Sequence, residues 1–123
     1  MKKIMVVDDE QDFLFTIKDV FKSFCDEYEL ITAKSGIQYL KLLEDNQIPD
    51  LFLLDIMMPD VNGWEVARKL RQNLKWKNIP IIFISAIGDR TSKITPIELA
   101  EEFIEKPFNM KDLKIKIDEI LKK

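Results

Sequence analysis

The chain contains several short apolar runs that stop abruptly at a charged or polar residue. Continuous hydrophobicity of this kind, without alternation, is typical of strands that are covered on both faces of a sheet. We therefore predict five strands, which lie at residues 3–7, 30–33, 51–55, 81–85 and 102–105.

Between these strands, apolar residues recur at helical spacing. This spacing predicts helices that pack on one side and meet solvent on the other. Ser35 and Asn109 stand where helix caps are expected. The predicted apolar faces are formed by Phe13, Leu14, Ile17, Val20, Phe21 and Phe24, by Ile37, Leu40 and Leu43, by Val66, Ala67, Leu70 and Leu74, and by Met110, Leu113, Ile117, Ile120 and Leu121.

The stretch from Gly88 to Leu99 has a weaker pattern. Thr95 precedes Pro96, and the residue before a proline avoids helical backbone angles. We expect a short or broken helix near residues 91–99. With this helix included, strands and helices alternate five times, which predicts an α/β fold with an open, doubly wound parallel sheet and helices on both faces.

The composition fits one compact domain and excludes several classes of function. A chain of 123 residues with 46% hydrophobic residues can build one core, so we expect a single domain over residues 1–123. With a net charge of −3, it lacks the basic field that suits a nucleic-acid backbone. It also lacks an apolar stretch of membrane-spanning length and a leader pattern, so we expect a cytoplasmic protein with no direct nucleic-acid or membrane partner.

Two residue types that often carry chemistry are missing or scarce. Histidine does not occur, which excludes a histidine base, a histidine metal ligand or a phosphohistidine on this chain. The single cysteine, Cys25, permits neither an internal disulfide nor a multi-cysteine metal site, and we interpret it as a packing residue.

Chemically useful side chains stand at the ends of four predicted strands. The first strand ends in Asp8 and Asp9, the third in Asp55, the fourth in Ser85 and the fifth in Lys106. Each of these residues by itself would be an ordinary turn or surface residue. Together they predict a site, because the carboxyl ends of parallel strands meet at one edge of the sheet.

The residue types in this group suit phosphoryl chemistry. Three neighbouring carboxylates repel one another, so they need protonation or a cation. Oxygen ligands without histidine or paired cysteines favour a hard ion, with Mg²⁺ as the first choice and Mn²⁺ as the second. A carboxylate can also attack phosphorus, and Lys106 and Ser85 could stabilise the phosphoryl oxygens.

Four stretches carry a resemblance to a known family. They are Val6–Glu10, Leu53–Pro59 with Gly63 after it, Ile84–Ala86 and Phe103–Phe108. In order and spacing they resemble the receiver domains of two-component response regulators, over essentially the whole chain. The resemblance implies a flavodoxin-like (βα)5 fold with strand order 2-1-3-4-5.

The resemblance also implies roles for the residues at the strand ends. Asp55 would accept a phosphoryl group from the phosphohistidine of a sensor histidine kinase or a histidine phosphotransfer protein. Asp9, Asp55 and the backbone carbonyl of Met57 would hold Mg²⁺, and Asp8 would help through a water molecule. Lys106 would contact the phosphoryl oxygens.

A switch is implied as well. Ser85 would move to bond the phosphoryl group, and Phe103 would change rotamer with it. The surface around the predicted helix at 91–99 and the fifth strand would change as a result. Phe103 stands where receivers often have tyrosine, so a switch-coupled hydroxyl hydrogen bond is absent. Ordinary packing is the alternative interpretation of this residue.

Two positions are expected to set the lifetime of the phosphorylated state. In receivers, the residues two beyond the acceptor and two beyond the serine or threonine tune autodephosphorylation. Here they are Met57 and Ile87, and neither can orient a water molecule by a hydrogen bond. We expect a long-lived phosphoaspartate, with self-phosphorylation and slow autodephosphorylation as the only enzymatic activities.

Three competing functions share parts of this pattern. A receiver-like interaction adaptor would have the same fold without phosphorylation. A hydrolase of the haloacid dehalogenase type would need a second aspartate at the position of Met57, and an FMN carrier would need a phosphate-binding loop where residues 8–10 stand. For the receiver, we expect no output domain on this chain, an effector that the sequence does not identify, and a monomer or weak dimer.

Overall fold

A computed structural model gives the arrangement of most of the chain. The predicted helix near residues 91–99 and the side chain of Cys25 lie outside the residues that the structure describes. The described residues are 2–24, 27–56, 58, 62–86, 102–106 and 108–122.

The central sheet consists of five parallel strands in the order β2-β1-β3-β4-β5. This order and the predicted α/β class are confirmed. The structure extends four of the predicted strands by one or two residues. Their bounds are β1 (Lys2–Val7), β2 (Tyr28–Ala33), β3 (Leu51–Asp55), β4 (Ile81–Ala86) and β5 (Glu102–Lys106).

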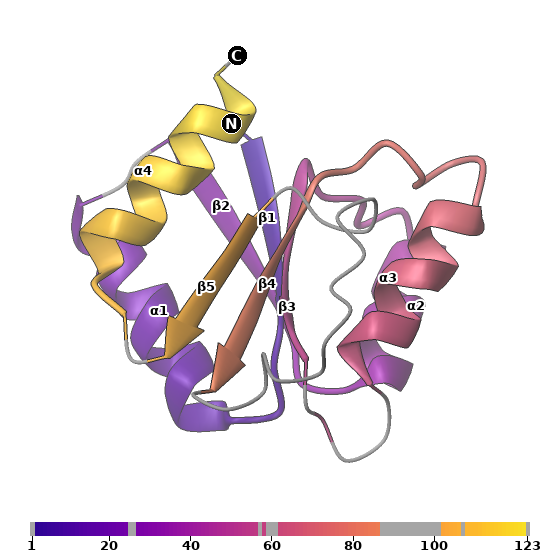
Figure 1. The fold of residues 1–123 in the computed structure, drawn as a ribbon, viewed down its shortest axis with the longest axis horizontal. Helices are drawn as coiled ribbons and strands as arrows, with labels where there is room; N and C mark the ends of the chain where they lie inside the picture. Colours follow the sequence, from indigo (N-terminus) through magenta and orange to yellow (C-terminus); the bar gives the residue numbers. More distant parts are fainter. Residues whose placement is uncertain are drawn as a thin grey trace.

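Two pairs of helices cover the two faces of the sheet (Figure 1). One face packs against α1 (Gln11–Phe24) and α4 (Met110–Leu121), and the other packs against α2 (Gly36–Glu44) and α3 (Gly63–Gln72). Among the helices in the described ranges, none has the length and apolar character needed to cross a membrane.

The burial of β1 explains why the strand segments read as continuous apolar runs. Ile4 and Val6 point into the core beneath α1 and α4, whereas Met5 and Val7 point into the core beneath α2 and α3. All four side chains are fully buried. Successive residues of a strand face opposite sides, so a strand with helices on both sides needs apolar residues at every position.

Side-chain caps begin three of the helices. The predicted caps are confirmed: the Ser35 hydroxyl accepts a hydrogen bond from the Gln38 amide, and the Asn109 side chain accepts one from the Lys111 amide. Asn62 caps α3 in the same way, which the sequence analysis did not anticipate. Each cap satisfies an amide that has no partner within its helix.

Two predicted core positions are wrong. Ile37 is exposed, because the inward stripe of α2 runs through Gly36, Tyr39 and Leu43 instead. Leu74 is also exposed, since α3 ends at Gln72 and the chain then leaves the apolar face of the helix. The other predicted helix faces pack against the sheet as expected, as far as the described side chains extend.

Candidate functional site

Three aspartates gather at the carboxyl end of the two central strands. Asp8 directly follows β1, and Asp55 is the last residue of β3. The two strands are neighbours, with Val7 paired to Leu54. One carboxylate oxygen from each of Asp8, Asp9 and Asp55 lies within 4.8 Å of the others. The predicted acidic cluster is therefore present, and its oxygen-only donor set fits a hard divalent cation.

Burial makes this cluster electrostatically costly. The side chains of Asp8 and Asp55 are buried, and Asp9 is half-buried. Burial raises the pKa of Asp8, even though the Glu10 amide and the Lys106 ammonium both stabilise its carboxylate. Carboxylates that lie close together away from solvent are stabilised when a cation binds among them.

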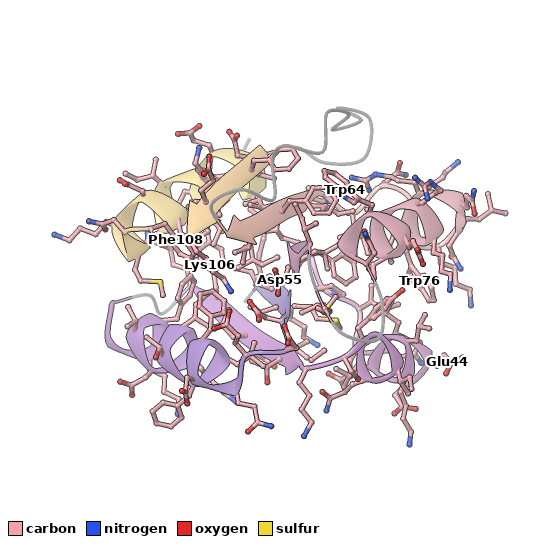
Figure 2. All side chains as sticks on the ribbon, turned by 60° about the horizontal axis from the view of Figure 1, so that its bottom comes forward. Glu44, Asp55, Trp64, Trp76, Lys106 and Phe108 are labelled. Carbon is pink, nitrogen blue, oxygen red and sulfur yellow. The ribbon has the colours of Figure 1, made fainter. Side chains whose placement is uncertain are left out.

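Lys106 brings positive charge to the cluster from the edge of the sheet. It ends β5, and its ammonium donates hydrogen bonds to Asp8 at 2.9 Å and to Glu10 at 2.8 Å. Burial by itself would lower the pKa of Lys106, but contacts with Glu10 and Asp8 and the nearby charge of Asp55 together raise it. Lys106 is therefore a cation close to Asp55 (Figure 2).

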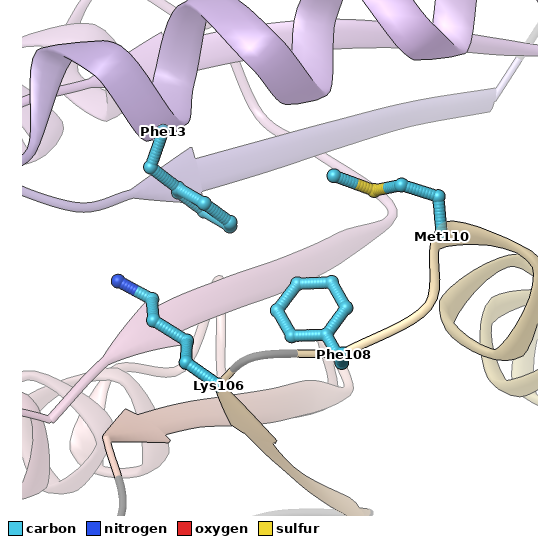
Figure 3. Close-up of a pocket in the computed structure, with 4 residues that line it drawn as sticks. All are labelled: Phe13, Lys106, Phe108 and Met110. Atoms are coloured by element: carbon cyan, nitrogen blue, oxygen red, sulfur yellow. The ribbon is translucent and has the colours of Figure 1, made fainter.

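The Lys106 ammonium also lies above an aromatic ring that the sequence analysis did not assign to the site. Its nitrogen is 4.5 Å from the ring centre of Phe13, the distance of a cation–π contact. Phe13 meets Phe108 edge to face at 5.9 Å. Together with Met110 these residues line an apolar cavity of about 440 Å³ beside the site (Figure 3). The sequence placed Phe13 on an apolar helix face, but helical spacing does not reveal a lysine from a distant strand.

Gly63 allows the start of α3 to approach the end of β3 closely. Its amide donates to the carbonyl oxygen of Ile56 at 2.7 Å. A Cβ atom at this position would lie 2.4 Å from the carbonyl oxygen of Asp55 and 2.8 Å from the Cα of Ile56. Only glycine fits without a backbone shift, so Gly63 sets how closely α3 approaches Asp55.

The other predicted site residues occupy two different settings. Ser85 lies in β4, directly after Ile84, which pairs with Asp55. Phe103 lies in β5 and is half-buried. Met57 and Ile87 lie outside the described residues. The fold thus brings the backbone of Ser85 to the same edge as the aspartates, while Phe103 belongs to the adjoining core.

Comparisons with known proteins agree with this geometry. The response regulator receiver domain model matches residues 4–118. A probable transcriptional regulator, ycf27 of Cyanophora paradoxa, is 37% identical over 99% of this chain, which spans 49% of the length of that relative.

Two solved structures of response regulator TrrA are also similar to the chain. TrrA from Thermotoga maritima, in complex with Mg²⁺ and BeF, is 34% identical, with a TM-score of 0.82 and coverage of 98% of this chain and 100% of that one. In the complex of TrrA with histidine kinase ThkA, the matched chain is 33% identical, with a TM-score of 0.81 and coverage of 98% and 99%. The chain belongs to the response regulator receiver domain family.

Proposed function

We propose that this domain accepts a phosphoryl group on Asp55 in a Mg²⁺-dependent reaction and uses it as a switch. The observation that carries the proposal is the acidic cluster of Asp8, Asp9 and Asp55, with Lys106 hydrogen-bonded to Asp8. Such a cluster combines a nucleophile, a cation site and a positive side chain within reach of one another.

In the proposed reaction, a carboxylate oxygen of Asp55 attacks the phosphorus of a partner's phosphohistidine. The new O–P bond forms as the N–P bond breaks, and the electron pair leaves with the imidazole nitrogen. Asp9, Asp55 and the Met57 carbonyl would hold Mg²⁺, with Asp8 contributing through water. Bound there, the ion would neutralise negative charge that builds up on the phosphoryl oxygens.

Lys106 and Ser85 would stabilise the product. Lys106 already shares its ammonium between Asp8 and Glu10, so it can exchange one of these contacts for a phosphoryl oxygen without leaving the site. The modification adds about −1.5 to −2 charges at neutral pH. Ser85 would donate its hydroxyl to the same group, and the difference in these contacts between states would drive the switch through Phe103.

The phosphodonor would be a sensor histidine kinase or a histidine phosphotransfer protein. The similarity to TrrA, which has been solved in complex with histidine kinase ThkA, supports a kinase partner. The relative ycf27, about twice as long as this chain, is named a probable transcriptional regulator.

The chain would act as a switch and not as a turnover enzyme. Its own chemistry would be limited to self-phosphorylation and slow autodephosphorylation. Because Met57 and Ile87 cannot orient an attacking water, phospho-Asp55 is expected to persist longer than in receivers with polar residues at those positions. Following the loss of the phosphoryl mass after removal of the phosphodonor measures this lifetime, and rapid loss with Mg²⁺ present would contradict the expectation.

The test of the main proposal uses acetyl phosphate as a small phosphodonor. With Mg²⁺, intact-mass measurement should show the gain of one phosphoryl group on the wild-type chain. Asp55→Asn should show none, because an amide is not a nucleophile toward phosphorus, and chelation of the metal should suppress labelling of the wild type. A folded wild-type protein that stays unlabelled would support the alternative, an interaction adaptor that works without phosphorylation.

A further inference from the structure

Three aromatic rings from three elements meet beside the proposed site. Trp64 lies in the first turn of α3, Phe83 lies in β4 and Phe103 lies in β5. The ring centres are 4.5 Å apart for Trp64 and Phe83, 5.8 Å for Trp64 and Phe103, and 5.3 Å for Phe83 and Phe103. Phe83 and Phe103 are paired positions on neighbouring strands, so their side chains lie on the same face of the sheet. Each ring thus contacts both of the others.

The backbone of Trp64 is tied to the end of the acceptor strand. Its amide donates to the Asn62 side chain at 2.7 Å, which fixes the first turn of α3. The residue before it, Gly63, donates to Ile56 at 2.7 Å and leaves no room for a Cβ atom beside the Asp55 carbonyl. A displacement of the Asp55 backbone would therefore move Gly63, which it contacts closely, and Trp64 is the next residue in the chain.

The Trp64 and Phe103 rings are less buried than the Phe83 ring. Phe83 is fully buried in a central strand and offers a fixed surface to both. Phe103 is half-buried on an edge strand, and Trp64 is half-buried at a helix start. When three rings pack in this way, a rotation of one half-buried ring changes the surface available to the other.

We propose that Trp64 is a positioning residue that couples the backbone at Asp55 to the rotamer of Phe103. This inference rests on the proposed phosphorylation of Asp55 and adds a second route to Phe103, which runs through Gly63 and α3 and is separate from Ser85. Packing alone would make Trp64 matter for stability only, whereas coupling makes it matter for the response to phosphorylation.

The first experiment uses tryptophan fluorescence, for which the chain offers a matched control. It has two tryptophans, Trp64 at the start of α3 and Trp76 after its end (Figure 2). In the described part of the chain, the buried Nε1 of Trp76 has no hydrogen-bond partner, so Trp76→Phe should be tolerated. This variant reports on Trp64 alone, and Trp64→Phe reports on Trp76 alone.

Each variant is titrated with beryllium fluoride in the presence of Mg²⁺, after a baseline with Mg²⁺ alone. The emission of Trp64 should change, and that of Trp76 should not. Adding Phe103→Leu to the Trp76→Phe background should reduce the change by about two- to tenfold, since the ring contact is lost. If the ligand acted on Trp64 directly, the emission change would be the same with and without Phe103→Leu, and this result would overturn the coupling.

The second experiment is a double-mutant cycle between positions 64 and 103. The beryllium fluoride concentration that gives half of the maximal response is measured for wild type, Trp64→Leu, Phe103→Leu and the double variant. The free energy of unfolding in urea is measured for the same four proteins. Coupling predicts that the effect of Trp64→Leu on the ligand response departs from additivity by about two- to tenfold. Trp64→Phe, which keeps a ring, should restore part of the coupling and also serves if the leucine variant does not fold.

The outcomes separate this inference from the proposed function. Additive effects on the ligand response, or a silent Trp64 in a protein that acetyl phosphate does label, would overturn the role of Trp64 and leave phosphorylation standing. If only the free energies of unfolding were non-additive, the rings would contribute packing and no coupling, and the proposed role of Trp64 would again be overturned. A wild-type chain that is never labelled would overturn both proposals.

Discussion

Two lysine–aspartate pairs in this protein have the same separation and opposite electrostatic outcomes. Lys106 lies 2.9 Å from an oxygen of Asp8, and Lys114 lies 2.9 Å from an oxygen of Asp118. The Asp8 side chain is 0% exposed, and its pKa is raised. The Asp118 side chain is 26% exposed, and its pKa is lowered. The distance between the charges therefore does not decide how well a pair stabilises its carboxylate.

The surroundings of the two carboxylates explain the difference. Asp8 sits among other acidic groups beneath the ends of the strands, where the loss of solvent outweighs the benefit of Lys106. Around Asp118, burial is the largest single influence and also raises the pKa, but the hydrogen bond from Tyr28 together with Lys114 and Lys122 outweighs it. The Lys106–Asp8 pair joins the end of β5 to the residue after β1. The Lys114–Asp118 pair lies within α4, and the hydrogen bond from Tyr28 to Asp118 connects α4 to the start of β2.

The largest expected effect comes from removing the cation that neutralises buried Asp8. Lys106→Met should lower the free energy of unfolding at pH 7 without Mg²⁺ by about 3 kcal/mol, because Asp8 is left buried beside other carboxylates without its cation. Lys114→Met is the matched control and should cost under about 1 kcal/mol, as expected for a pair near the surface. Urea unfolding of both variants measures the difference, and equal losses would break the comparison.

An intermediate effect is expected from filling the close approach at Gly63. Gly63→Ala should lower the free energy of unfolding by about 2 kcal/mol, because the added Cβ would meet the Asp55 carbonyl at 2.4 Å and backbone must shift. Labelling by acetyl phosphate should also slow, since the shift moves the acceptor. Unchanged stability and unchanged labelling would show that the backbone at Asp55 and Ile56 accommodates the added Cβ atom without cost.

The smallest effect is expected at the network around Asp118. Tyr28→Phe should lower the free energy of unfolding at pH 7 by about 1 kcal/mol through loss of one hydrogen bond to a carboxylate. Because the folded pKa of Asp118 lies below its unfolded value, its contribution is complete above the unfolded pKa and is lost as pH falls through the folded one.

The pH dependence gives a second check on the same pair. Stability curves from pH 7 down to acid should fall less steeply for Asp118→Asn than for wild type, with Tyr28→Phe in between. The slopes of the curves should differ mainly at pH values below an ordinary aspartate pKa of about 3.9. Curves that run parallel over this range would mean that Asp118 contributes no pH-dependent stability.

Much of the fold could be predicted because its pattern is local. Continuous apolar runs identified the strands, and the caps at Ser35 and Asn109 were visible in the sequence. The errors at Ile37 and Leu74 have local causes too: Ile37 fits more than one stripe at the start of α2, and Leu74 follows the end of α3. Helical spacing alone cannot tell which stripe faces the sheet.

The candidate site was only partly predictable for a different reason. Asp8, Asp9, Asp55 and Lys106 could be grouped because each ends a strand, and parallel strands end at one edge. The contacts of Phe13 with Lys106 and of Trp64 with Phe103 join elements far apart in the chain. No periodicity or motif encodes such pairs, because they depend on the final positions of helices over the sheet.

The sequence by itself therefore determined which residues stand at the ends of the strands and, through its apolar runs, that those strands are buried. Tertiary structure decided the electrostatics. It removed Asp8 from solvent and brought Lys106 to it from the edge strand, whereas it left Asp118 near the surface. The physical reason is that residue type sets the charge of a side chain, but the solvent and the dipoles that remain around it set the free energy of that charge.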